Sequence, residues 1–484
     1  MNRRMAWVTI VFTLFLSACS VGRKYVEPDV QNFDTGTFGE VERQEDSAAR
    51  AFRTAEPVAA WWHQFDDPQL ADLVDTALAH NHDVRAALAN LREARALLRS
   101  RKLDRLPTVE SQASGSRQQV SADSGTGTLP DRNWETYAVG LDAIWEADLF
   151  GRVSQRIASA SASLDIREAD LHGVYVSVAA ETASTYIEYR GLQYRLQVAQ
   201  RNADNQEQTY RLTVDLADAG RSDQLNVARA QTQLELTRST IPLLEAQRDA
   251  VLHRLGVLTG ALPTALFARL QEVKALPSLP DAVDVGDPLG LLTRRPDIRR
   301  AERELALATA QYNLQVAELY PEVRVSGSIG FSATAFDNLG SSGTSVYSFG
   351  PSIRWAAFNL GRVRRGIEAA DARTDASLAS FEKTVLLALE EVETSLVDFN
   401  KREQSRAKLL LAARAGAQAS EYAKLRFNAG IDNFLDVLDA ERTLLDAQER
   451  LARSETEVAL SLVGIYKALG GGWQAPVIQA NAGL

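Results

Sequence analysis

Few residues of this chain have a type and spacing that could do chemistry, and the most suggestive are two carboxylates. Asp436 and Asp439 lie three residues apart, which in a helix places them on nearly the same face. Such a pair favours cations and resists anions, or it belongs to an ordinary solvated helix face. Arg442 lies one turn beyond Asp439 and could pair with it within the helix. Any chemistry of these three residues would therefore come from their charges.

Patterns typical of enzymes and metal sites are missing from the sequence. The five histidines are scattered, and the run His80-Asn81-His82 lacks the i, i+4 spacing of a helical metal pair. No serine elbow, phosphate-binding loop or dinucleotide fingerprint occurs. We therefore predict no catalytic residue, no metal site and no cofactor.

The single cysteine lies at the end of an export signal. Arg3 and Arg4 precede an apolar stretch at 6–16, which is far shorter than the roughly 20 residues of a transmembrane helix. The run Leu16-Ser17-Ala18-Cys19 resembles a bacterial lipobox, although a plain secretory signal is the alternative. Residues 1–18 are thus expected to be a lipoprotein signal peptide, and 19–64 an extended N-terminal segment with covalent lipid on Cys19. Because Ser20 and not Asp follows, the expected destination is the outer membrane.

The charge balance excludes one class of partner. With 53 Lys+Arg against 63 Asp+Glu, the net charge is −10, whereas nucleic-acid binding needs a basic face. The hydrophobic share of 45% is ordinary for a folded chain.

The chain contains an internal repeat, because four landmarks recur in the same order and at the same spacing. Tyr137, Gly140, Trp145 and Gly151 reappear as Tyr347, Gly350, Trp355 and Gly361. The predicted organisation is repeat 1 at 65–260, a linker at 261–284, repeat 2 at 285–470 and a C-terminal tail at 471–484.

Proline placement predicts long helices in both repeats. No proline occurs at 131–241 or 352–475, while five cluster between positions 263 and 296. Each repeat therefore has room for a helix that runs from Gly151 towards Gly220, or from Gly361 towards Gly430. A helix of this length with one polar face must pack against partners.

Four segments read as strands, at about 108–119, 134–146, 322–332 and 345–358. The third alternates, with Val323, Val325 and Ile329 opposite Arg324 and Ser326. Each has about the length of a tilted membrane strand, but four strands cannot close a barrel in lipid. A barrel would have to be shared between subunits; the alternative is a soluble sheet that caps a helical bundle. Four of the aromatic residues in these segments could mark membrane interfaces or pack in a core: Trp134, Trp145, Tyr347 and Trp355.

Three motifs resemble those of one family. They are Trp61-Trp62-His63-Gln64-Phe65, the run from Leu291 to Glu302 with Arg294-Arg295-Pro296-Asp297, and the run from Gly430 to Ala440. These residues resemble outer membrane efflux factors of the TolC/OprM/NodT type, over nearly the whole chain.

The resemblance implies a mixed α and β fold: a homotrimer with a twelve-stranded outer membrane β-barrel, continued by a long periplasmic α-helical barrel. It implies a passive, gated duct that exports small molecules, together with a periplasmic adaptor protein and an inner-membrane transporter of the resistance-nodulation-division class. The alternatives are a type I protein-secretion duct and a structural lipoprotein that tethers the outer membrane across the periplasm.

The resemblance also assigns roles to residues. Leu435, Asp436, Asp439 and Arg442 would form the periplasmic gate, with Leu435 as an apolar constriction. In a trimer the two aspartates would give two rings of three carboxylates. The tips facing the adaptor would comprise Gly220, Arg221, Asp223, Gly430 and Asp432, although both glycines could be purely structural turns. Asp432 stands where some relatives carry an arginine that helps to hold the gate closed, so that arginine contact is not expected here.

Overall fold

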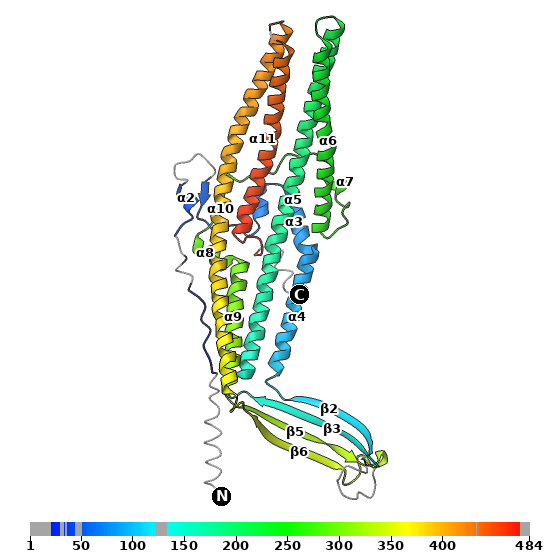
Figure 1. Ribbon diagram of the computed structural model, residues 1–484, viewed down its shortest axis with the longest axis vertical. Helices are drawn as coiled ribbons and strands as arrows, with labels where there is room; N and C mark the ends of the chain where they lie inside the picture. The colour runs from blue at the N-terminus through cyan, green and yellow to red at the C-terminus, as the bar shows by residue number, and fades with distance from the viewer. Residues whose placement is uncertain are drawn as a thin grey trace. The chain divides into compact units, whose positions relative to one another are not determined.

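The computed structural model describes residues 21–29, 33, 36–43, 51–119, 121, 133–431 and 433–474, which leaves Cys19 and Asp432 outside the described residues (Figure 1). The chain forms two compact units, and each takes segments from both sequence repeats. Unit 1 comprises Met1–Pro28, Asn90–Arg167 and Arg300–Glu382, and unit 2 comprises Asp29–Ala89, Glu168–Arg299 and Lys383–Leu484. The compact units therefore do not coincide with the two repeats.

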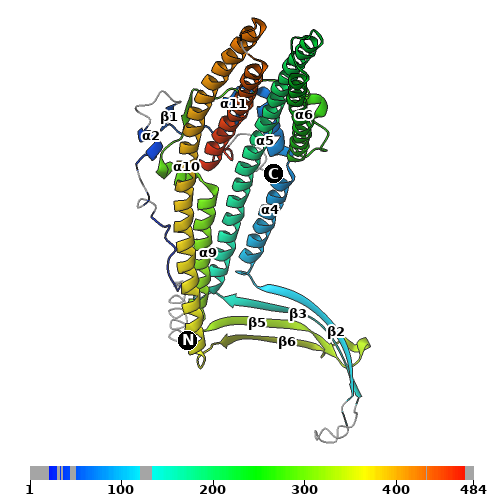
Figure 2. The same cartoon turned by 45° about the horizontal axis from the view of Figure 1, so that its top comes forward.

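Unit 1 contains an antiparallel sheet of four strands in the order β2-β3-β5-β6. Its strands lie side by side and curve together in both views (Figures 1 and 2). Their bounds are β2 Thr108–Gln119, β3 Asn133–Ala147, β5 Glu322–Ala333 and β6 Ser345–Arg354. A short 3-10 turn, η4 (Phe336–Asn338), lies between β5 and β6.

The fourth strand is shorter than the sequence predicts. It was expected at 345–358, but it ends at Arg354, whose partner is Glu322, the first residue of β5. Residues beyond Arg354 have no neighbouring strand to pair with, and a strand persists only where its backbone is paired.

The strands β3 and β5 approach each other most closely at two facing glycines. Gly140 and Gly330 are register partners, and a Cβ added to Gly330 would lie 2.3 Å from the Val139 carbonyl oxygen. Any larger residue would push these strands apart, so glycine here has a packing reason. The four aromatic residues singled out from the sequence, Trp134, Trp145, Tyr347 and Trp355, are all exposed in one chain, with Tyr347 86% exposed, so they do not form a core within it.

The helical part of unit 1 is built from four elements. These are the second half of α4 (His82–Leu103), the start of α5 (Arg152–Asp218), α9 (Pro296–Ala317) and the start of α10 (Leu360–Asn428). Leu98, Val153 and Ile157 form an apolar cluster between α4 and α5. The Asp148 carboxylate accepts hydrogen bonds from the backbone N–H groups of Val153 and Ser154, both at 2.9 Å, and so caps the start of α5.

Unit 2 is mostly helical. Besides the remainder of α5 and α10, it holds α3 (Pro68–His80), the start of α4, α6 (Gln224–Leu258), α8 (Pro288–Arg294) and α11 (Phe434–Ala468). Figures 1 and 2 show α6 beside α5 and α11 beside α10. The helices α6 and α11 each have 35 residues, as expected of equivalent parts of a repeat. Helix α6 continues through Pro242, although a proline removes one intrahelical hydrogen bond.

The Trp61 motif forms the centre of the core of unit 2. The short 3-10 helix η3 (Trp61–Phe65) buries both tryptophans completely, and the Trp61 ring stacks on Tyr466 of α11 at 5.0 Å between centroids. The Arg295 side chain, only 10% exposed, binds Glu391 of α10 and Asp297, each at 2.7 Å. The Trp61–Phe65 motif and the motif around Arg295 therefore stabilise the core, the first through large apolar side chains and the second through buried ion pairs.

Two segments are more ordered than the sequence predicts. The N-terminal segment 19–64 contains α2 (Gly39–Arg43) and β1 (Ala51–Arg53) besides η3, and the linker 261–284 contains α7 (Phe267–Leu270) and β4 (Ala282–Asp284). The reason is that β1 and β4 pair with each other in parallel, which satisfies backbone groups that an isolated extended segment would leave to solvent. Among the described residues, none of the helices combines the length and apolar character needed to cross a membrane.

Candidate functional site at the helix turns

The α5–α6 turn is a tight cap whose residues have clear structural roles. Gly220 has a φ of 68°, which is the left-handed conformation that glycine adopts most easily. The Arg221 N–H donates to the Leu216 carbonyl at 2.8 Å, which closes the end of α5. The Asp223 carboxylate accepts from the Asn226 N–H at 2.9 Å and so caps the start of α6. Arg221 and Asp223 are both exposed.

The α10–α11 turn repeats this geometry at the same end of unit 2 (Figure 1). Gly430 has a φ of 73°, and the Ile431 N–H donates to the Arg426 carbonyl at 3.0 Å. Asn433 is the cap of α11, since its side chain accepts from the Leu435 N–H at 2.8 Å. Asp432 was predicted to face an adaptor at this tip and lies outside the described residues.

The first turns of α11 carry two stripes of opposite character. Phe434, Val437 and Glu441 form a buried stripe, at i, i+3 and i+7. Leu435, Asp439 and Arg442 form an exposed stripe, and Asp436 is exposed as well. All four predicted gate residues are therefore accessible, with Leu435 47% exposed.

A groove of about 490 Å³ brings three of these residues together with residues of α6. Leu435, Asp439 and Arg442 line one side, whereas Leu225 and Arg229 line the other. Asp436 is not among the residues that line it. Below the groove, Ala230 of α6 packs against Phe434 and Val437, so the two hairpins contact each other directly.

In the described part of the chain, the charged residues of the groove do not form the intrahelical pair between Asp439 and Arg442 that their spacing of one turn allows. Arg229, which occupies the position of Asp439 in the first repeat, brings a second cation to the groove. The two repeats therefore place opposite charges at equivalent positions.

Arg229 and Glu441 were not predicted from the sequence as residues of this site. The repeat offset could have revealed Arg229 as the counterpart of Asp439. Glu441 was overlooked because a glutamate between Asp439 and Arg442 reads as another surface charge, whereas it is only 4% exposed.

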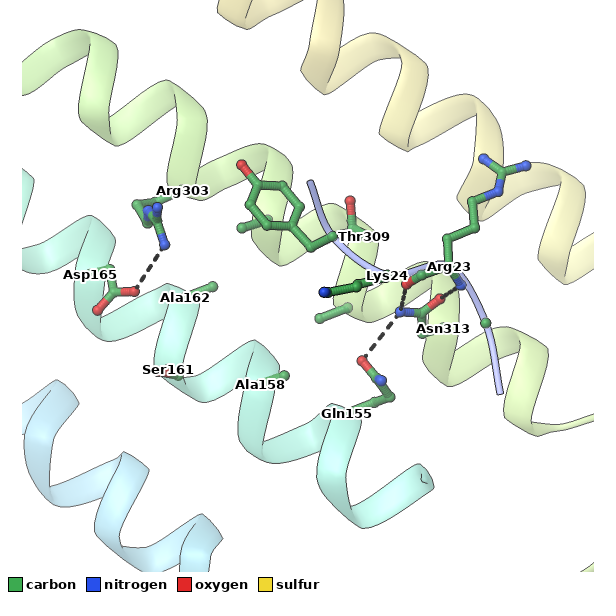
Figure 3. Close-up of a pocket in the computed structure, with 14 residues that line it drawn as sticks. Arg23, Lys24, Gln155, Ala158, Ser161, Ala162, Asp165, Arg303, Thr309 and Asn313 are labelled. Carbon is green, nitrogen blue, oxygen red and sulfur yellow. Dashed lines mark hydrogen bonds and ion pairs between the residues drawn. The ribbon is translucent and has the colours of Figure 1, made fainter. Parts of the chain in front are cut away.

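A cavity in unit 1 has a different role, which Figure 3 shows in close-up. It measures about 530 Å³ and lies where residues 22–25 run along α9. The Asn313 side chain binds both backbone groups of Arg23, accepting from its N–H at 2.8 Å and donating to its carbonyl at 2.9 Å (Figure 3). Asn313 also donates to Gln155, and Arg303 pairs with Asp165 at 3.6 Å. These contacts fix residues 22–25 against α9.

Tyr25 adds a further contact to this segment. Its hydroxyl donates to the Glu302 carboxylate, and burial together with that hydrogen bond raises the pKa of Tyr25. Within the described residues, no group of three or more His, Cys, Asp or Glu side chains could hold a metal ion.

The sequence matches the sequence model of the family described as "Outer membrane efflux protein" over residues 73–261 and 290–471. "Solvent efflux pump outer membrane protein SrpC" of Pseudomonas putida is 32% identical over 430 residues, which cover 88% of this chain and 89% of that protein. "Pyoverdine export outer membrane protein OpmQ" of Pseudomonas aeruginosa is 30% identical, with coverage of 87% and 89%.

Two solved structures support the same assignment. The outer-membrane channel OprN is 40% identical with a TM-score of 0.86, and the match covers 94% of this chain and 100% of that chain. The open state of the MtrE outer membrane channel of Neisseria gonorrhoeae is 28% identical with a TM-score of 0.78, covering 94% and 98%. Because the family match covers more than half of the sequence and the fold agrees, this chain belongs to the outer membrane efflux protein family.

Proposed function

We propose that this chain is the outer membrane channel of a tripartite efflux system, a passive duct that leads small molecules from the periplasm to the exterior. The proposal depends on one observation. A chain of this family contains both a four-stranded antiparallel sheet and a long helical hairpin whose turn bears exposed carboxylates. A duct has no reacting group, so its chemistry is the charge and width of its narrowest part.

The sheet supports assembly into a homotrimer. Its outer strands β2 and β6 each have one neighbour within the chain, and an open strand edge is not tolerated in lipid. Three copies of four strands give a twelve-stranded barrel, which is wide enough for an aqueous lumen. Exposed apolar side chains on β6, such as Phe349 at 80% and Ile353 at 70%, suit a lipid-facing surface. Native mass spectrometry of the detergent-solubilised protein tests the trimer.

The turn residues support a gate at the periplasmic end. In a trimer, Asp436 and Asp439 of three chains would surround one opening, with Leu435 as the apolar constriction and Arg442 as a partner for a neighbouring carboxylate. Opening would require the ends of the hairpins to separate. The turns at Gly220 and Gly430, with Arg221, Asp223 and Asp432, would face a periplasmic adaptor, which connects to an inner-membrane transporter of the resistance-nodulation-division class.

Relatives named for solvent and pyoverdine export favour small molecules as the exported class. A type I protein-secretion duct remains the second candidate with the same fold. A periplasmic tether would need no sheet with exposed apolar strands, so the sheet favours a duct over a tether.

The decisive experiment is single-channel recording of the purified protein in a planar bilayer, with the wild type beside Asp436→Ala/Asp439→Ala. We expect small, cation-selective currents in the wild type, and larger currents with weaker cation selectivity in the double variant, because six carboxylates are removed from the constriction of a trimer. Absence of any current from folded, membrane-inserted protein in both forms would contradict the duct and favour the tether.

A further inference from the structure

The buried stripe of α11 contains one residue that does not belong in a core. Phe434 and Val437 pack against Ala230, but the next residue of the stripe is Glu441, at 4% exposure. A buried carboxylate is costly unless it is paired and hydrogen-bonded, so this position needs a specific reason.

Glu441 joins three helices through one oxygen atom. Its Oε1 accepts a hydrogen bond from the Thr209 hydroxyl of α5 at 2.9 Å, and the Lys424 Nζ of α10 lies 2.7 Å from the same oxygen. The Thr209 hydroxyl has a single proton, which can be donated instead to the Asn205 carbonyl at 3.2 Å, and Lys424 is 42% exposed. Both partners therefore remain solvated or bonded when Glu441 moves away.

In the part of the chain that the structure describes, several buried polar atoms around Glu441 lack hydrogen-bond partners. Among the described residues, Glu441 Oε2 has no hydrogen-bond partner, and neither polar atom of the Gln206 amide has one, although Gln206 is 3% exposed and lies one turn before Thr209. Buried polar atoms without partners cost free energy, so this arrangement holds the helices together less firmly than apolar packing would.

The first repeat has no counterpart of this contact. The position equivalent to Glu441 is Gln231 of α6, which is exposed. The buried acid is therefore specific to the hairpin that carries the four gate residues.

Farther along α11, the contact with α5 becomes tight. A Cβ added to Gly191 of α5 would lie 2.3 Å from the Thr456 hydroxyl oxygen of α11, so these helices touch closely there. Between this contact and the turn, Arg195 pairs with Glu449 through a hydrogen bond of 2.8 Å. The α5–α11 contact is thus close at Gly191 and contains two polar pairs between Gly191 and the turn, Arg195 with Glu449 and Thr209 with Glu441. Next to the second pair, Tyr210 of α5 packs against the apolar cluster of Phe434 and Val437.

We propose that Glu441 is a positioning residue of the gate, which holds the first turns of α11 against α5 and α10 with contacts that can be released. The proposal rests on the proposed function, since it concerns the opening of that same gate. Glu441 lies one residue before Arg442 and two after Asp439, so releasing it frees the exposed stripe to move. Once released, its carboxylate reaches water, which offsets the contacts that are lost.

Two substitutions at this position should have opposite effects. Glu441→Leu replaces a partly satisfied acid with apolar packing against Phe434 and Val437, so separating the helices becomes more costly, and the fraction of time open should fall roughly fivefold or more. Glu441→Ala removes the contacts without replacing the packing, so the open fraction should rise by a similar factor. A residue with a merely structural role would lower the amount of folded protein in both variants and leave gating unchanged.

The measurement is single-channel recording in planar bilayers on full-length trimers, with thermal unfolding of the same preparations. The matched control is Asp446→Asn, which removes an acid that pairs with Arg450 on the exposed face of the same helix and should leave the open fraction unchanged. Opposite shifts for Glu441→Leu and Glu441→Ala support the proposal.

Equal open fractions for both Glu441 variants and the wild type would overturn the proposal. If the Asp436→Ala/Asp439→Ala variant still enlarges the current, the duct assignment stands without it. If the wild type shows no current at all, the proposed function itself fails. A change in unfolding temperature without a change in gating also counts against a positioning role.

Discussion

Exposed and buried acids on the first turns of α11 have different physical roles. Asp436 and Asp439 face solvent, where the proposed gate would place them beside passing ions, whereas Glu441 contacts Thr209 of α5 and Lys424 of α10. Asp223 and Asn433 have a third role, because their side chains cap α6 and α11. Of the predicted tip residues, Gly220, Asp223 and Gly430 therefore have structural roles, and contact with an adaptor would be an additional role.

Gly430→Ala should lower the free energy of unfolding by about 1 kcal/mol, because alanine at a φ of 73° is strained. Thermal unfolding of the purified protein measures this. Gly464→Ala is the control, since Gly464 lies inside α11 with open space at its Cβ position, and alanine there should be neutral or stabilising. Equal destabilisation by both changes would contradict the role assigned to the left-handed turn.

Glu455 of α11 provides a pH-dependent prediction. Burial raises the pKa of Glu455 above the ordinary value of 4.5, so its ionised form is less favourable in the folded protein than in the unfolded one. Stability is therefore lost as pH rises from about that ordinary value through the raised one, and the whole penalty is present at higher pH. Glu455→Gln should unfold at a higher temperature than the wild type at pH 8, with a smaller difference at pH 4.

Glu457→Gln is the control for that experiment. Glu457 accepts from Arg402 and Arg453, each at 2.9 Å, so neutralising it removes two charge-assisted hydrogen bonds. This variant should be less stable than the wild type at pH 8. A Glu455→Gln protein that behaves in the same way would refute the burial argument.

Among the elements, the long helices and the sheet were predictable because their patterns are local. Absence of proline predicted α5 and α10, and alternation of Val323, Val325 and Ile329 against Arg324 predicted β5. The pairing of β1 with β4 was not predictable, because two three-residue strands from distant parts of the chain carry no periodic signal. The site was predictable only as far as exposed charge was concerned, since burial of Glu441 depends on how α5, α10 and α11 pack.

Equivalent positions of α5 and α10 carry buried polar residues that bind different segments of unit 2. Arg190 of α5 is fully buried and donates to Gln69 of α3 at 2.5 Å and to the Glu272 carbonyl at 2.8 Å. Its counterpart in α10 is Asn400, which binds Glu40 of α2. A buried polar side chain at this point of each repeat thus binds a segment outside the repeats, which is the linker at Glu272 in one case and the N-terminal segment at Glu40 in the other.

Arg190→Met should therefore destabilise the protein by about 3 kcal/mol or more, since it leaves several buried acceptors without donors. Arg201→Met is the comparison, because Arg201 is exposed on the same helix and its loss should change stability little. Denaturant titration of both variants gives the difference. A small effect at Arg190 would show that water can replace the guanidinium there.

At the scale of the whole molecule, attachment to the membrane is expected to have two independent parts, covalent lipid and strands. Cys19→Ser should abolish labelling by radioactive palmitate. The protein should nevertheless stay in the outer membrane fraction, because the four strands of each chain remain. A soluble periplasmic product would contradict the membrane role of the sheet.

The interleaving of the two repeats has a consequence for biosynthesis. Unit 1 joins Asn90–Arg167 to Arg300–Glu382, and unit 2 needs Lys383–Leu484 beside segments that precede it by hundreds of residues. Unit 1 cannot be completed before Glu382 has been exported, and unit 2 cannot be completed before the last helix has; pairing of such distant segments is also slow. The newly exported chain therefore spends time with unpaired strand edges and apolar helix faces exposed, and it should depend on periplasmic chaperones that bind such surfaces until the last helix arrives.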